Sequence, residues 1–162
     1  MGRFLSIWSH IRLYFVIESP QVKTLLLIDD RLGPNQSVNR VHQIVSLLQE
    51  SLIGKCKVLG FDPDQALTYL KDKDNSVDLL VCDHNLWWRQ RENKTYEYRY
   101  GYQLMMKFRE YRGNLPPTII FSDDELAEGM WRDAGVEYET FVPKWGDEFK
   151  NLLAAVNLKL LS

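Results

Sequence analysis

The sequence is poor in the residues that build disulfide frameworks and soft-metal centres. Its 162 residues include only two cysteines, Cys56 and Cys82, and three histidines. Both cysteines stand in apolar stretches, where a buried, reduced thiol is the usual state. The sequence therefore offers neither a disulfide scaffold nor a Cys/His cluster for zinc, and a reducing cytoplasm is the simplest compartment to expect.

An excess of charge of one sign is also absent. Lysine and arginine total 20 against 22 aspartate and glutamate residues, and the formal net charge is −2. No overall field therefore attracts the protein to nucleic acid or to an anionic membrane, and we expect neither as a partner.

Long hydrophobic runs are missing as well. The most apolar stretch, residues 4–17, is interrupted by His10 and Arg12 and is too short to cross a bilayer as a helix. No cleavage site of small residues follows it, which argues against a secretory signal. Its apolar residues recur at helical spacing. We therefore expect an N-terminal extension over residues 1–22, with a helix packed on the domain; dimerisation or contact with a membrane surface are the alternatives.

Linkers, repeats and low-complexity tracts are absent from the remainder. Hydrophobic residues make up 45% and charged residues 26% of the chain, which is typical of a globular protein. A chain of this length can build one sizeable core. We expect a single domain over residues 23–162, with no fused output domain.

Short apolar runs alternate with amphipathic segments along this domain. The runs predict strands at residues 23–28, 55–61, 77–82, 118–121 and 138–142. Helical spacing of apolar residues predicts helices from about residue 39, over 62–73, after residue 101, over 125–134, and from about residue 147. Five alternating strands and helices indicate an α/β fold with a parallel sheet and right-handed crossovers.

Four of these strands end on polar side chains. The first ends at Asp29 and Asp30, the third at Asp83, the fourth at Ser122 and the fifth at Lys144. Ligands of open α/β sheets bind outside the carboxyl ends of the strands. If the strands are neighbours, three carboxylates, one hydroxyl and one ammonium converge on one patch.

Clustered carboxylates raise one another's pKa unless a cation compensates them. Mg²⁺ prefers oxygen ligands, commonly carboxylates, water and phosphate. A carboxylate can also be a nucleophile that forms an aspartyl phosphate, and phosphoryl transfer needs mainly positioning and neutralisation of charge. The patch therefore predicts magnesium-dependent phosphoryl chemistry.

In this arrangement the sequence resembles the receiver domains of two-component response regulators, from Lys23 to about Leu160. The resemblance implies a flavodoxin-like, doubly wound, five-stranded sheet of order 2-1-3-4-5. It also implies a Mg²⁺ site in which Asp30 is a direct ligand, Asp29 acts mainly through water, Asp83 is the phosphoacceptor and the carbonyl of Asn85 completes the shell.

The same resemblance gives roles to residues of the last two strands. Ser122 resembles the hydroxyl that binds a phosphoryl oxygen, and Lys144 resembles the lysine that pairs with it, at the family's usual separation of 22 residues. Phe141 stands where the family has an aromatic switch residue, and Gly101 resembles the glycine that opens the third helix. The resemblance therefore implies a catalytic set of three residues, Asp83, Ser122 and Lys144.

Three features depart from the family's pattern. Gly101 stands 18 positions after Asp83, about ten more than the family commonly has there, so the loop after the phosphoacceptor carries an insertion. Asp123 replaces a small residue, and a carboxylate turned inward there would repel phosphate. Trp145 replaces the usual proline, so the cis peptide expected from the resemblance does not carry over.

The inserted segment combines aromatic and cationic side chains, namely Trp87, Trp88, Arg89 and Arg91, followed by three tyrosines. Such mixtures occur at protein hot spots and in single-strand nucleic-acid sites. We expect a lid or hairpin folded over the active face, with a partner-docking loop as the second reading and a nucleic-acid site as the third.

These observations lead to two functional hypotheses. In the first, a sensor histidine kinase or histidine phosphotransfer protein phosphorylates Asp83, and the protein signals through contacts with partners or with a second copy. Its catalysis would be limited to self-phosphotransfer and autodephosphorylation. In the second, the chain is a phosphorylation-independent pseudo-receiver that serves as a binding scaffold. A haloacid dehalogenase-like phosphatase would need Asp-x-Asp, but Arg31 stands two residues after Asp29.

Overall fold

Five parallel strands form the centre of the protein. The structure, a computed structural model, describes residues 22–34, 36–86 and 98–160. The strands are β1 (Lys23–Ile28), β2 (Cys56–Phe61), β3 (Leu79–Cys82), β4 (Thr118–Ser122) and β5 (Thr140–Pro143). They lie in the order β2-β1-β3-β4-β5, and every neighbouring pair is parallel. The predicted α/β class and strand order are confirmed.

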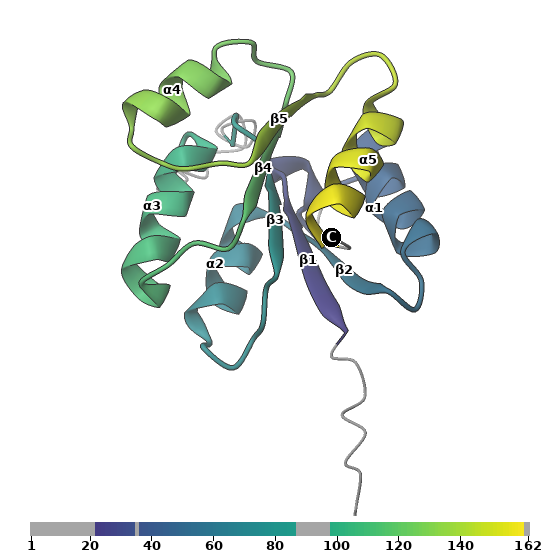
Figure 1. Cartoon of the computed structure of the whole chain (residues 1–162), viewed down its shortest axis with the longest axis horizontal. Helices are drawn as coiled ribbons and strands as arrows, with labels where there is room; N and C mark the ends of the chain where they lie inside the picture. The colour runs from purple at the N-terminus through teal and green to yellow at the C-terminus, as the bar shows by residue number, and fades with distance from the viewer. Residues whose placement is uncertain (1–21, 35, 87–97, 161–162) are drawn as a thin grey trace, which may run out of the picture.

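Helices cover both faces of the sheet (Figure 1). They are α1 (Arg40–Ser51), α2 (Pro63–Lys71), α3 (Gly101–Arg112), α4 (Ala127–Asp133) and α5 (Glu148–Leu160). Helices α1 and α5 pack on one face, while α2, α3 and α4 pack on the other. Because a right-handed crossover joins each strand to a parallel neighbour, the helices switch faces where the strand order reverses, beside β1.

Each strand contributes alternate side chains to two separate cores. In β1, Leu25 and Leu27 pack under α1 and α5, whereas Leu26 and Ile28 face α2 and α3. Because successive side chains of a strand point to opposite faces, a central strand buried on both sides must be apolar throughout. This is why the strands appear in the sequence as continuous hydrophobic runs.

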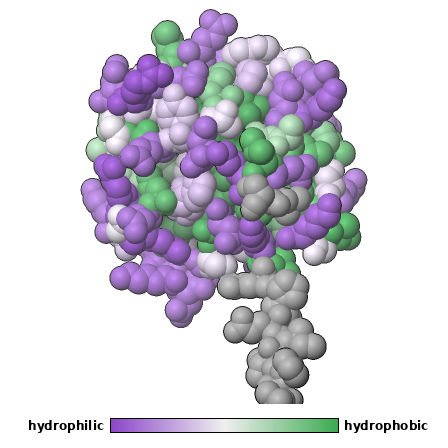
Figure 2. All heavy atoms as spheres, viewed as in Figure 1, coloured by the Kyte–Doolittle hydropathy of each residue, from purple (hydrophilic) through white to green (hydrophobic). Residues whose placement is uncertain are grey.

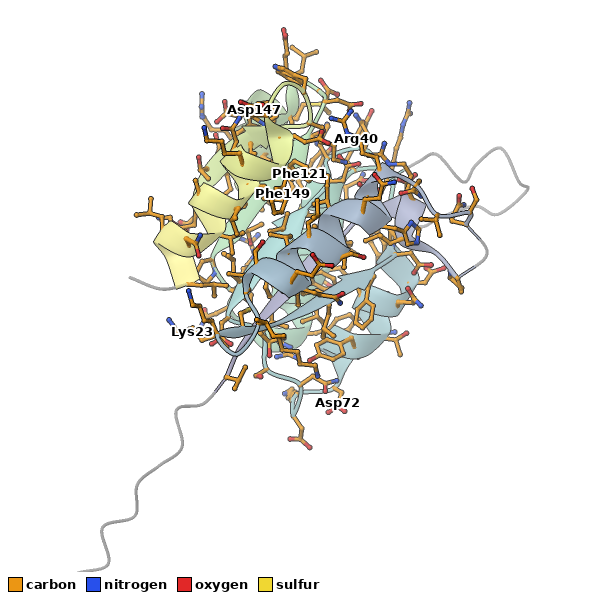
Figure 3. All side chains as sticks on the ribbon, turned by 90° about the vertical axis from the view of Figure 1, so that its right-hand side faces the viewer. Lys23, Arg40, Asp72, Phe121, Asp147 and Phe149 are labelled. Carbon is orange, nitrogen blue, oxygen red and sulfur yellow. The ribbon has the colours of Figure 1, made fainter. Side chains whose placement is uncertain are left out.

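Helices α1 and α5 are also joined at their ends. They lie side by side in Figure 3, with Phe121 and Phe149 labelled between them. Arg40, the first residue of α1, forms an ion pair with Glu148, the first residue of α5. At the opposite end of the layer, the ammonium of Lys23 donates to the carbonyl of Leu160. These contacts fix α5, which follows Lys144, against the start of the sheet.

Side-chain caps set several helix boundaries. The carboxamide of Asn39 accepts from the N–H groups of Val41 and His42, and Asp62 forms a reciprocal capping box with Gln65. Helix α4 begins two residues later than predicted, at Ala127. There Asp124 accepts from the backbone of Leu126 and Ala127 and closes a turn ahead of the helix.

Other boundaries also differ from the sequence-based expectation, among them those of β5, which spans Thr140–Pro143 rather than residues 138–142. The segment that joins β1 to α1 begins with a 3₁₀ turn, η1 (Asp30–Leu32), capped by Asp29. Strand β3 begins at Leu79 rather than residue 77, because the side chain of Asp78 accepts from the N–H of Thr24. Asp78 therefore ends the ladder locally.

The predicted N-terminal helix lies outside the described residues, which begin at Val22. Across the described part of the chain, no helix combines the length and the apolar character that a membrane crossing requires. On the face shown in Figure 2, most of the surface is hydrophilic, and hydrophobic residues are visible between the hydrophilic ones.

Gly101 allows the start of α3 to approach the backbone of Asp83 and His84, just after β3, very closely. Its N–H donates to the carbonyl of His84 over 2.7 Å. A Cβ atom added there would lie 2.2 Å from the carbonyl oxygen of Asp83 and 2.9 Å from both Cys82 Sγ and the Trp131 ring. The backbone carbonyl of Asp83 could make room for this Cβ atom only if Asp83 itself shifted.

We therefore expect Gly101→Ala to lower the free energy of unfolding by about 3 kcal/mol. Gly129→Ala is the matched control, because it lies within α4 and a Cβ there meets nothing within 4 Å. This control should gain about 0.5–1 kcal/mol from helix propensity. Urea unfolding followed by circular dichroism measures both, and equal stabilities for the two variants would contradict the prediction.

Candidate functional site

The carboxyl ends of the strands bring the predicted residues together. Asp29 and Asp30 follow β1, Asp83 follows β3, Ser122 ends β4 and Lys144 follows β5. Each of the three carboxylates is buried, and one oxygen from each lies within 4.8 Å of the others. Sheet geometry therefore assembles the patch from residues far apart in sequence.

Lys144 joins two of these carboxylates. Its Nζ lies 2.6 Å from Asp29 Oδ2 and 2.6 Å from Asp83 Oδ2. Its backbone N–H donates to the carbonyl of Ser122, and its ammonium lies 5.3 Å from the centre of the Phe121 ring. The aliphatic part of the side chain thus crosses apolar surface while the charge stays between the two carboxylates.

A second cation, Arg31, lies on the same site. Its Nε is 3.0 Å from Asp29 Oδ1, and its Nη2 is 3.1 Å from Asp29 Oδ2. The same Nη2 lies 3.7 Å from Asp83 Oδ2. Arg31 occupies this position because η1 begins at Asp30, with the Asp29 carboxylate accepting the backbone N–H of Arg31 as the cap.

The pKa values of the two carboxylates that contact Lys144 are shifted in opposite directions. Burial raises the pKa of Asp29, but the charges and hydrogen bonds of Lys144 and Arg31 outweigh burial and hold that pKa well below its usual range. Burial raises the pKa of Asp83 to about 6, and the charge of Asp29 adds to the rise while Lys144 opposes it. Burial would lower the pKa of Lys144, but Asp83 and Asp29 raise it above the usual value. Lys144 therefore remains charged.

The loop after β4 supplies an acidic group, but it is Asp124 rather than Asp123. The side chain of Asp123 is exposed, so the inward carboxylate considered from the sequence is absent at that position. Asp124 instead accepts from Asn85 Nδ2 over 3.4 Å, and its backbone N–H donates to Ser122 Oγ over 3.3 Å. Asp124 thus links the end of β4 to the loop after Asp83.

His84, the neighbour of Asp83, is completely buried. Its Nδ1 accepts from the indole N–H of Trp131 on α4 over 3.1 Å. Because an indole N–H can only donate, Nδ1 carries no proton and the imidazole is neutral; burial also lowers the pKa of His84. The ring stacks on Tyr100 at 4.9 Å between centroids. A hydrogen bond and a ring stack therefore connect the segment after Asp83 to helices α3 and α4.

The inserted segment after Asp83 starts and ends on paired backbone. Asn85 and Tyr100 form an antiparallel bridge, and the N–H of Leu86 donates to the carbonyl of Arg99 over 3.0 Å. The candidate loop residues Trp87, Trp88, Arg89 and Arg91 lie outside the described residues. The two ends of the predicted insertion are thus held together next to Asp83.

Phe141 is half-buried on the face of β5 that packs toward α2, α3 and α4. Ser122 and Phe141 project from the same face of the sheet, since Ile120 and Phe141 are paired and Ser122 follows Ile120 by two residues. The Phe141 ring lies 6.3 Å from that of Trp145. No peptide bond among the described residues is cis, including the one before Trp145.

The donor set fits a hard divalent cation. The three buried carboxylates offer oxygen ligands, and the carbonyl of Asn85 stands in the adjacent loop, two residues after Asp83. Oxygen donors of this kind suit Mg²⁺ rather than zinc or copper. Two protein cations already lie against the site, so a metal would enter a cluster that is partly neutralised.

Comparison with known proteins identifies the fold. A receiver domain protein (CheY-like) from Methanospirillum hungatei has a TM-score of 0.58 at 15% identity, over 86% of this chain and 94% of that one. A LuxR family DNA-binding response regulator from Silicibacter pomeroyi has a TM-score of 0.56 at 21% identity, over 86% and 93%. The phosphorylated cyanobacterial phytochrome response regulator RcpA has a TM-score of 0.61 at 14% identity, over 87% and 95%.

The chain therefore has the fold of response regulator receiver domains, as its sequence motifs indicate. No protein-family model matches it, and no curated protein does. At these identities, the structural likeness establishes the architecture alone.

Three features of the site had no clear signal in the sequence. Arg31 was visible only as the residue that breaks an Asp-x-Asp motif, because its contact with Asp29 depends on the 3₁₀ turn. The His84–Trp131 hydrogen bond joins residues 47 positions apart. The role of Asp124 depends on which of two adjacent carboxylates the turn directs inward.

The raised pKa of Asp83 predicts how stability responds to pH without metal. A carboxyl whose pKa is about 6 when folded and about 3.9 when unfolded binds its proton more tightly in the folded state. Stability should therefore rise as pH falls from about 7 to 4. Asp83→Asn should remove this dependence and raise the free energy of unfolding at pH 7 by about 2–3 kcal/mol.

Urea unfolding in a chelator at pH 7 and pH 5 measures this effect. Asp123→Asn is the matched control, because that carboxylate is exposed and its removal should leave stability and its pH dependence nearly unchanged. An Asp83→Asn variant no more stable than the wild type at pH 7 would contradict the interpretation.

Proposed function

We propose that the protein is a phosphoacceptor of two-component signalling, phosphorylated on Asp83 in the presence of Mg²⁺. The observation that supports this most directly is the ammonium of Lys144, held 2.6 Å from both Asp29 and Asp83 where their strands end. Asp83 is buried beside this fixed cation. A nucleophile next to a preorganised positive charge is what phosphoryl transfer requires.

In the proposed reaction, an oxygen of Asp83 attacks the phosphorus of a phosphohistidine on a sensor kinase or phosphotransfer protein. The P–N bond breaks, its electron pair passes to the imidazole, and the imidazole takes a proton from solvent. The product is an acyl phosphate on Asp83. Lys144 and the hydroxyl of Ser122 would hold the phosphoryl oxygens, and hydrolysis by water would return the carboxylate and inorganic phosphate.

The residues that would hold the metal are Asp30 and Asp83 directly, with the carbonyl of Asn85, and Asp29 through water. Bound there, Mg²⁺ would neutralise charge on the phosphoryl oxygens. The protein groups would orient the acceptor and keep one ammonium in place, which lowers the reorganisation that accompanies transfer.

Phosphorylation would bias a surface formed by α4, β5 and α5, and through it the contacts with a partner or a second copy. Phe141 lies on this surface, on the same face of the sheet as Ser122. The contact between His84 and Trp131 gives a further physical link, because a shift of the backbone after Asp83 would act on α4 through one buried hydrogen bond.

A phosphorylation-independent binding scaffold is the second candidate. The observation that favours it is the pair of cations at Asp29, because Lys144 and Arg31 already compensate the acidic site without a metal. A scaffold of this kind would use the segment inserted after Asp83 as its binding element.

The first test is the intact mass of the protein after incubation with a small-molecule phosphodonor and Mg²⁺. The wild type should gain one phosphoryl adduct, and the adduct should disappear in chelator and in Asp83→Asn. Asp123→Asn is the matched control, and it should be phosphorylated as the wild type is, since its side chain is exposed.

An unmodified wild-type protein that is folded and binds neither Mg²⁺ nor beryllofluoride would refute the phosphoacceptor proposal and favour the scaffold. An adduct that persists in Asp83→Asn would place the acceptor elsewhere.

A further inference from the structure

Arg31 is a charged side chain that contacts the acidic cluster and has no part in the proposed phosphoryl transfer. It lies in η1, directly after the acidic pair, and its side chain is about one-third exposed. The carboxylate that it contacts is only 1% exposed. A partly solvated guanidinium thus closes over a buried carboxylate from the solvent side.

The hydrogen bonds of Asp29 leave no acceptor position open. Its Oδ1 accepts from the backbone N–H of Arg31 at 2.9 Å and from Arg31 Nε at 3.0 Å. Its Oδ2 accepts from Arg31 Nη2 at 3.1 Å and from Lys144 Nζ at 2.6 Å. A carboxylate offers about four lone-pair sites, so all four are in use and three of them are held by Arg31.

This saturation matters for any divalent cation at the site. The proposed role of Asp29 is to accept a hydrogen bond from a metal-bound water. That water can reach Asp29 only if it displaces one of the four hydrogen-bond donors. The donors next to solvent are the N–H groups of the Arg31 side chain. Guanidinium and hydrated metal therefore compete for the same oxygens.

Charge acts in the same direction. Among the described residues, the cations Arg31 and Lys144 contact this cluster of three carboxylates, and each lowers its negative charge by one unit. Removal of Arg31 would make the cluster one unit more negative. Attraction of a divalent cation scales with this charge, and burial of the carboxylates weakens screening by solvent.

We propose that Arg31 is a built-in competitor of the divalent cation, so that the resting site binds Mg²⁺ weakly until the guanidinium leaves Asp29. The inference rests on the proposed function in that it uses the same metal site. Arg31 acts as a positioning and competing residue: it sets how readily the acidic pair accepts the metal and takes no part in bond making.

The test is calorimetric titration of Mg²⁺ into the metal-free protein at pH 7 and fixed ionic strength. Arg31→Gln should bind Mg²⁺ at least about tenfold more tightly than the wild type. Arg31→Lys, which keeps the charge but loses the two-point fork, should lie between them. Arg132→Gln is the matched control, because it removes the same charge from an exposed position on α4, and it should change the affinity by less than about twofold.

A second measurement uses the wild type alone and does not depend on the variants folding. The Nε–H of Arg31 is hydrogen-bonded to Asp29 in the metal-free structure, and it should therefore give a side-chain signal in ¹H–¹⁵N spectra. Saturation with Mg²⁺ should shift this signal and accelerate its exchange with solvent. A signal that stays unchanged at saturating Mg²⁺ would overturn the proposal.

The outcomes separate this inference from the proposed function. If the wild type binds Mg²⁺ and Arg31→Gln binds it equally or more weakly, competition by Arg31 is refuted while the phosphoacceptor proposal stands. If neither protein binds Mg²⁺, both are refuted. Tighter binding by Arg31→Gln, with Arg132→Gln unchanged, supports the competitor.

Discussion

The contact on which the site depends is the ion pair that Lys144 makes with Asp29 and Asp83. It connects β5, at the edge of the sheet, with β1 and β3 on the far side of β4. A buried carboxylate without a compensating cation is strongly unfavourable, so the ammonium is what permits two of them at the ends of adjacent strands. The register of the sheet and the length of β5 are therefore constrained by electrostatics as well as by packing.

Compensation by protein cations also reduces the need of the acidic cluster for a metal ion. An acidic cluster that carried its full negative charge would require a cation for stability. Here Arg31 and Lys144 both contact Asp29, so the described structure is electrostatically consistent without one. The same geometry would therefore serve either of the two proposed functions, a signalling receiver or a phosphorylation-independent scaffold. The two would differ in how readily the guanidinium of Arg31 leaves Asp29.

The sequence predicted the strands well because both faces of the sheet are covered, which makes each central strand an uninterrupted apolar run. Convergence of Asp29, Asp83 and Lys144 followed from the rule that parallel strands end at one edge; the strand order itself came from the family resemblance. Arg31 and the His84–Trp131 pair were missed, since both depend on the rotamers of side chains that no periodic pattern specifies. The choice between Asp123 and Asp124 was missed because one turn decides it.

The paired ends of the inserted segment have an engineering consequence. Leu86 and Arg99, near its two ends, are hydrogen-bonded to each other. When the two ends of a loop are already held together, a change in its length alters mainly the loop-closure entropy, which grows only logarithmically with length. A folded reporter whose own termini are close together can therefore be spliced between these ends, beside Asp83, with its linkers rather than the sheet absorbing the added chain.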